Sequence, residues 1–141
     1  MAPPNTTVTF RVRYVETDLM GGYYHGRALD WFEMGRTELS RSLGVPYAEW
    51  ERRGVFIPVI EVAIKYKSRA TYDDLLRMTV SAETVGRTRL KFTHTVVQAD
   101  SGRLVCEGST VHALIDAHGF PQRIPEWVLA LMEGDPGSSM A

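Results

Sequence analysis

The sequence predicts an α+β fold in which one long helix packs against a five-stranded antiparallel sheet. A strand-like segment comes first, a long amphipathic helix follows, and four more strand-like segments come after the helix. Most of these four are joined by turns of two or three residues, which are too short to connect parallel strands. The 141 residues suffice for one hydrophobic core, so we expect a single domain over residues 7–133 with flexible tails at 1–6 and 134–141.

The first strand and the long helix are recognised by their periodicity. Apolar and polar residues alternate over residues 7–14, as in a strand with one buried face. Over residues 27–43 the apolar residues recur every three or four positions, so they share one helical face, and Gly44 and Pro46 then end the helix. Gly35 lies inside this helix, where glycine costs about 1 kcal/mol relative to alanine. It therefore predicts close approach to another backbone.

The rest of the chain predicts two short helices and four strands. The helices are expected over residues 46–53 and 125–132, and the strands over residues 55–67, 75–85, 88–99 and 104–115. Pro58 favours an edge position for the first of these strands, because proline cannot donate a hydrogen bond within a sheet. One helix cannot cover the whole sheet or protect that edge, so we expect the chain to form a homodimer or homotetramer through edge pairing and stacking.

Composition argues against several classes of function. A net charge of −1 gives no overall electrostatic reason to expect nucleic acid or a membrane as partner. The one cysteine, Cys106, excludes an internal disulfide framework, and we interpret it as a buried apolar residue in a reducing compartment. No signal peptide or bilayer-spanning run is visible, so a cytoplasmic protein is expected. His94, His112 and His118 lack the spacing of metal ligands, so no metal site is expected.

The stretch from Glu16 to Glu38 contains the candidate site. It begins with acids just after the first strand, crosses the Gly21-Gly22 pair and His25, and continues as the long helix. Backbone N–H groups at the start of a helix lack intrahelical partners and can hold a developing oxyanion. A carboxylate, a glycine turn and a helix start in this order predict a site for chemistry on a carbonyl.

These residues resemble the hot-dog-fold acyl-CoA thioesterases of the 4-hydroxybenzoyl-CoA thioesterase type. The resemblance spans about residues 8–114 and rests on Arg13-Tyr14, Glu16-Thr17-Asp18-Leu19-Met20-Gly21, Tyr24-His25, Trp31-Phe32-Glu33, Arg36-Thr37-Glu38, Tyr72-Asp73-Asp74 and Gly86-Arg87-Thr88. It implies a hot-dog fold, in which the sheet wraps around a long central helix. It also implies hydrolysis of an acyl-CoA, or of an acyl group on a carrier protein, to a free acid and a thiol.

The resemblance also assigns roles to residues. It implies that Asp18 is the catalytic carboxylate, as nucleophile or as general base, and that the His25 backbone N–H polarises the thioester carbonyl. The side chains of Tyr24 and His25 would shape the site. Two alternatives stay open: a hot-dog dehydratase of β-hydroxyacyl thioesters that uses His25 with Glu33, and an acyl-thioester binding protein without catalysis. Asp18 alone is also typical of an acid that caps a helix.

Two groups of basic residues are candidates for binding the phosphates of coenzyme A. They are Lys65, Lys67 and Arg69 in one group and Arg87, Arg89 and Lys91 in the other. Coenzyme A would be part of the substrate, so no separate cofactor is expected. Gly22, Gly26 and Ala28 stand where relatives often carry larger residues, and they predict a roomier acyl site. Neither the acyl chain nor the choice between dimer and tetramer follows from the sequence.

Overall fold

The computed structural model describes residues 3–133. Its elements in order are β1 (Asn5–Arg11), α1 (Arg27–Ser42), α2 (Tyr47–Arg52), β2 (Val59–Tyr66), β3 (Leu75–Val85), β4 (Arg89–Gln98), β5 (Leu104–Ala113) and α3 (Glu126–Met132). The five strands form one antiparallel sheet in the order β1-β3-β4-β5-β2. The predicted fold class is therefore confirmed, and β2 lies at the sheet edge as Pro58 indicated.

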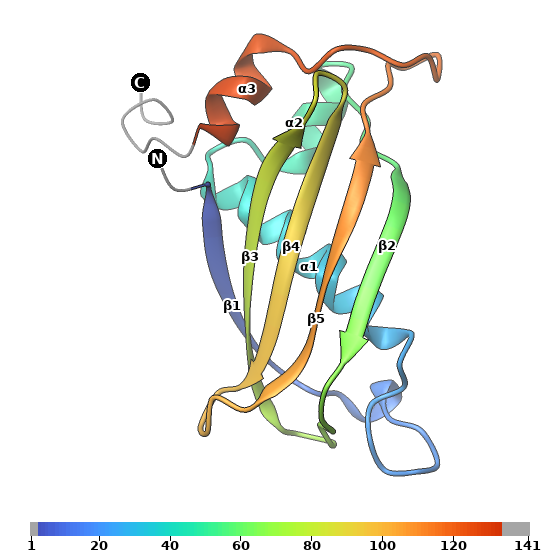
Figure 1. Cartoon of the computed structure of the whole chain (residues 1–141), viewed down its shortest axis with the longest axis vertical. Coiled ribbons are helices and arrows are strands. Elements are labelled where there is room, and N and C mark those ends of the chain that lie inside the picture. Colours follow the sequence, from blue (N-terminus) through green and yellow to red (C-terminus); the bar gives the residue numbers. More distant parts are fainter. Residues whose placement is uncertain (1–2, 134–141) are drawn as a thin grey trace.

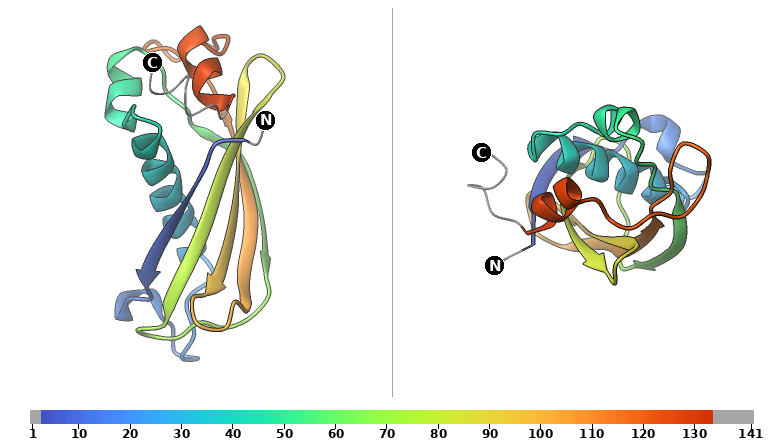
Figure 2. Two further views of the ribbon diagram at one scale, coloured as in Figure 1. Left: turned by 90° about the vertical axis from the view of Figure 1, so that its left-hand side faces the viewer. Right: turned by 90° about the horizontal axis from the view of Figure 1, so that it is seen from above.

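The sheet curves around α1, which crosses its concave face obliquely (Figures 1 and 2). The helices α2 and α3 lie near the end of the sheet that carries the β3–β4 turn. The loop between β1 and α1 lies at the opposite end, close to where β2 finishes (Figure 1). The candidate site and the β3–β4 turn therefore lie at opposite ends of the sheet.

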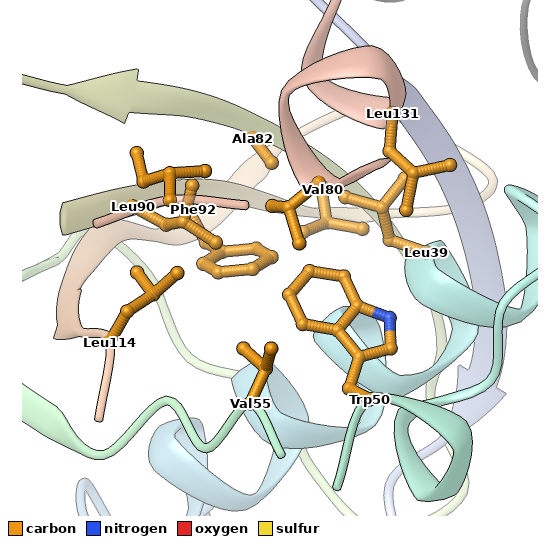
Figure 3. Packing of buried hydrophobic residues seen from close by; sticks show 11 residues of the cluster. Leu39, Trp50, Val55, Val80, Ala82, Leu90, Phe92, Leu114 and Leu131 are labelled. Carbon is orange, nitrogen blue, oxygen red and sulfur yellow. The ribbon is translucent and has the colours of Figure 1, made fainter. Parts of the chain in front are cut away.

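Alternating residues of the central strands face α1 and form the core. Around the first half of α1, Trp31 and Phe32 pack against Met78 and Val96 from the sheet. Around its second half, Leu39 packs with apolar residues of α2, α3 and the sheet. Trp50 of α2 points into this second cluster toward Phe92 and Val80 (Figure 3). Burial of large side chains along the whole of α1 fixes the helix against the sheet.

Strand boundaries differ from the prediction most clearly in β1 and β2. Asn5 and Thr6 pair with Ser81 and Val80, so the expected flexible tail over residues 1–6 is wrong for these two residues. The tail predicted at 134–141 lies outside the described residues. The first strand also ends at Arg11, because the chain folds back into a 3₁₀ turn at Tyr14–Glu16. Likewise, β2 begins four residues later than expected, since Phe56 makes only an isolated bridge with Ile115.

Two glycines allow close packing between layers, and only one was anticipated. A Cβ at Gly35 would lie 2.9 Å from the methyl carbon of Met78, so α1 approaches a side chain of β3 and not its backbone. At Gly108 in β5 a Cβ would collide with the Ala63 carbonyl oxygen of β2 and with the ring of Phe32. The close backbone approach that Gly35 suggested is therefore found at Gly108.

Candidate active site

The loop between β1 and α1 holds Asp18 in a tight turn. The Asp18 N–H donates to the Gly22 carbonyl (2.9 Å), the Gly21 N–H donates to the Asp18 carbonyl (3.1 Å), and Gly21 has a φ of +85° that favours glycine. An isolated bridge between Thr17 and Tyr23 closes the base of the turn. The Asp18 side chain is exposed, and its Oδ1 accepts a hydrogen bond from the Met20 N–H (2.9 Å). Its carboxylate is thus oriented by the loop and still open to a substrate.

The start of α1 carries backbone donors without partners. The Tyr24 N–H donates to the Glu16 carbonyl (2.8 Å), and the Tyr66 hydroxyl donates to the His25 carbonyl (2.9 Å). Within residues 3–133, however, the N–H groups of His25 and Gly26 make no hydrogen bond. A helix N-terminus carries a partial positive charge. Two free N–H groups at this position suit the oxygen of a polarised carbonyl.

Glu16 is a buried carboxylate that ties the loop to α1. Only 3% of its surface is exposed, and its side chain accepts hydrogen bonds from the Arg13 N–H (2.7 Å), the Trp31 indole N–H (3.0 Å) and the Arg13 guanidinium (3.3 Å). Donors therefore compensate its charge. This role could not be predicted from a local pattern, because Trp31 is fifteen positions further along the chain.

The aromatic and small residues near Asp18 have different surroundings. The exposed Tyr24 ring lies 4.3 Å from the His25 ring, and a Cβ at Gly26 would lie 3.0 Å from Tyr24. A Cβ at Gly22 would lie 3.2 Å from the Arg69 side chain, so Gly22 makes room for an arginine. Ala28 is fully buried in the core beside α1. The prediction that Ala28 widens an acyl site is therefore wrong, because its side chain faces the sheet.

The two basic groups lie toward opposite ends of the sheet. Lys65 and Lys67 flank Tyr66, which contacts His25, and the Arg69 guanidinium donates to the Met20 carbonyl in the site loop. By contrast, Arg87 lies in the β3–β4 turn, and β4 begins just beyond it with Arg89 and Lys91 (Figure 1). Within one chain Arg69 of the first group contacts the loop that holds Asp18, whereas Lys65, next to Tyr66 on β2, faces the other side of the sheet, and the second group lies at the far end.

Glu33 and His25 are also apart within one chain. They are eight positions apart, about 12 Å along a helix axis at 1.5 Å per residue. The exposed Glu33 instead lines a cavity of about 260 Å³ between α1, α2 and the start of β2. Arg36, Tyr47 and His112 are further polar residues of its wall. The sequence analysis missed this cavity, because its residues are distant in the chain and carry no motif.

Buried titratable groups of the core are held in their neutral forms. Burial, followed by the charge of Arg36, lowers the pKa of His94 to about 3, and the ring stacks 4.1 Å from Phe32. Burial lowers the pKa of His112 to about 4 and raises that of the Cys106 thiol to about 11. The interpretation of Cys106 as a buried residue is confirmed.

Residues 3–133 contain neither a group of metal-ligating side chains nor a helix that could cross a membrane. No group of three or more His, Cys, Asp or Glu side chains lies close enough to hold a metal ion. In the same part of the chain no helix has the length and apolar character needed to cross a membrane.

Comparisons with known proteins bear on the family and the fold. Residues 12–132 match the model of the thioesterase-like superfamily. YneP of Bacillus subtilis (strain 168), provisionally named an acyl-CoA thioesterase, is 31% identical over 121 residues, which cover 82% of this chain and 87% of YneP. The crystal structure of a hypothetical protein from Aquifex aeolicus has a TM-score of 0.84 at 28% identity, covering 90% of this chain and 98% of that one. For a DHNA-CoA thioesterase from Staphylococcus aureus the TM-score is 0.82 at 28% identity, with 92% and 87% covered.

Proposed function

Because this chain belongs to the thioesterase-like superfamily, we propose that it hydrolyses the thioester bond of an acyl-CoA to a free acid and coenzyme A. The family match agrees with the resemblance noted in the sequence and with the predicted hot-dog fold. The single observation that carries the proposed mechanism is the combination, in one short segment, of the exposed Asp18 carboxylate and the two free N–H groups at the start of α1.

The proposed chemistry divides between Asp18 and the backbone. The thioester oxygen accepts hydrogen bonds from the N–H groups of His25 and Gly26 as negative charge develops on it. Removal of one such donor typically raises the activation free energy by about 3 to 4 kcal/mol. In one route the Asp18 carboxylate attacks the carbonyl carbon, the C–S bond breaks, and water hydrolyses the resulting anhydride. In the other route Asp18 takes a proton from the water that attacks the carbonyl. Both routes release the thiol and the acid.

We further propose that two copies pair through β2. This edge strand exposes Val59, Ile60, Val62 and Tyr66, each by 44–48% of its surface. A twofold axis makes such edge pairing antiparallel, so each copy is reversed relative to the other. The end with Arg87, Arg89 and Lys91 of one copy then lies toward the Asp18 end of the other. Dimerisation therefore supports a role for both basic groups in binding one coenzyme A.

A thiol-release screen tests the proposed activity. Purified protein is incubated with aliphatic and aromatic acyl-CoAs, and free thiol is detected with a disulfide reagent. Thiol release supports the thioesterase. Enoyl absorbance without thiol would indicate the dehydratase that uses His25 with Glu33. Binding of CoA esters without cleavage would indicate a binding protein and would contradict the proposal.

A further inference from the structure

The cavity between α1, α2 and the start of β2 combines apolar walls with one half-buried cation. Leu39, Trp50 and Phe92 supply much of the apolar surface, and Arg36 of α1 reaches the same space. Burial lowers the pKa of Arg36, and the charge of Glu33 only partly offsets this effect. No carboxylate of the described residues lies within 4.0 Å of the Arg36 guanidinium. A guanidinium in such a place is poorly solvated and lacks a direct counter-ion.

Hydrogen-bond directions show that Arg36 has donors to spare. The His112 Nδ1 lies 2.8 Å from the Ile57 carbonyl, which can only accept, so Nδ1 carries the proton. The ring is neutral because burial lowers its pKa to about 4, and its Nε2 therefore accepts from the Thr110 hydroxyl at 2.8 Å. Thr110 has then used its proton and can only accept from Arg36 Nη1, at 3.5 Å.

This series of hydrogen bonds holds the Nη1 atom of the guanidinium. The arginine side chain has five N–H donors. Within residues 3–133 the Arg36 side chain makes one hydrogen bond, the long one to Thr110. A purely aliphatic ligand in the cavity would leave the remaining donors desolvated and unpaired. A ligand with an anionic oxygen would pair with them, and guanidinium binds carboxylates in a two-pronged geometry.

The entrance of the cavity is suitably placed for an acyl group. Pro58 and Val59, at the start of the β2 edge, are part of its lining. If β2 pairs with a second copy along its whole length, Val59 comes beside the second copy's Tyr66, the residue whose hydroxyl binds the His25 carbonyl. A thioester held at the helix start of one copy then extends its acyl group into the cavity of the other. An apolar cavity of about 150 Å³ can hold benzene, so one of about 260 Å³ has room for a short acyl chain.

We propose that this cavity binds the acyl group and that Arg36 makes the enzyme select acyl groups with a carboxylate at their far end. The substrate class is the mono-CoA thioester of a short dicarboxylic acid. This inference rests on the proposed function, since it assigns the acyl specificity of the same active site. Arg36 is a specificity-determining residue, whereas the bond-breaking step stays with Asp18 and the start of α1.

Two substrates of equal chain length test the inference. Adipoyl-CoA ends in a carboxylate, and hexanoyl-CoA ends in a methyl group. Wild type should show at least a tenfold higher kcat/KM for adipoyl-CoA, the size of effect expected for one charge-assisted hydrogen bond. Arg36→Met should abolish this preference, mainly by raising KM for adipoyl-CoA. Arg36→Lys, which keeps the charge and loses the planar fork, should restore part of the preference.

Binding measurements separate failure of this inference from failure of the proposed function. Calorimetric titration of Asp18→Asn protein, with and without Arg36→Met, gives the affinity for both CoA esters without turnover. Tighter binding of adipoyl-CoA that is lost with Arg36→Met supports the inference even if no ester is cleaved. Equal affinity and equal kcat/KM for the two esters in wild type would overturn it, and would leave the thioesterase proposal standing. The wild-type comparison does not depend on whether an Arg36 variant folds.

Discussion

Asp18 and the start of α1 divide the proposed chemistry between one side chain and the backbone. The loop orients the Asp18 carboxylate through the Met20 N–H, and the buried Glu16 holds the loop on Trp31. In the proposed mechanism His25 contributes through its N–H group, while its exposed side chain lies at a tilted angle to the Tyr24 ring. The proposed oxyanion donor therefore requires the backbone N–H of His25 and does not require its imidazole side chain.

Two substitutions at His25 should separate these contributions. His25→Ala keeps the N–H, so kcat for thiol release should fall less than about tenfold. His25→Pro removes the N–H, so kcat should fall about 100-fold or more, the usual effect of losing one oxyanion donor. Thermal unfolding checks that both variants are folded. A loss with His25→Ala as large as that with His25→Pro would place the catalytic role in the imidazole.

The neutral core histidines make stability depend on pH. The pKa values of His94 and His112 are about 3 and about 4 in the fold, below the value of about 6.5 for an unfolded histidine. The unfolded chain therefore binds more protons below pH 6.5, so stability is full above that pH and decreases as the pH falls toward 4 and 3. At pH 5 the loss should be roughly 2 kcal/mol for each histidine.

Urea denaturation at pH 7.5, 6 and 5 measures this loss. His94→Leu should reduce the decrease in unfolding free energy by about half, because it removes one of the two groups. The exposed His118, replaced by Asn, serves as the control. Equal stability at pH 7.5 and pH 5 in wild type would show that the two rings are not held neutral.

At the level of elements, the sequence predicted segments better than the contacts between them. The bounds of α1 and β3 followed from periodicity, Gly44 and short turns, which are local signals. The start of β2 was placed too early, because the apolar residues from Val55 onward pack into the core without joining the ladder. The need for a glycine at Gly108 was invisible, since it arises from β2 and Phe32 meeting at one point of β5.

For the candidate site, too, the local segment was predictable and the contacts between distant residues were not. Asp18, Tyr24 and His25 lie in one continuous segment, so a motif could find them. The sets that depend on tertiary contacts could not be found that way: Glu16 with Trp31, and Arg36 with Thr110 and His112. Hydrogen-bond partners so far apart in sequence leave no local pattern.

The start of β4 supplies a test of coenzyme A binding. Arg89→Ala combined with Lys91→Ala should raise KM for an acyl-CoA about tenfold and leave kcat unchanged, because each of two exposed phosphate contacts contributes about 0.7 kcal/mol. The same acyl group on N-acetylcysteamine has no phosphates, so its KM should not change. Arg52→Ala, an exposed arginine of α2, is the control. An unchanged KM for the acyl-CoA would remove this basic group from the site.

The whole molecule is proposed to act as a dimer, since one chain alone leaves β2 exposed and its two basic groups apart. Val62→Asp would place carboxylates close to their symmetry mates on the paired edge. It should give a monomer by light scattering and lower thiol release at least tenfold, while the fold of the chain is kept because Val62 is 45% exposed. Val85→Asp, on β3 away from the edge, should remain dimeric and active. A monomeric wild type with full activity would contradict the shared site.

The central claim is that Asp18 performs the chemistry on a thioester, and the rate of thiol release at saturating acyl-CoA tests it most directly. Wild type, Asp18→Asn and Asp30→Asn are compared on the best substrate of the screen. Asp30 is an exposed acid in the first turn of α1, paired with Arg27, so its loss should change kcat little. Asp18→Asn should lower kcat about 100-fold or more, because it removes the nucleophile or base and keeps the shape of the side chain. Full turnover by Asp18→Asn would contradict the account.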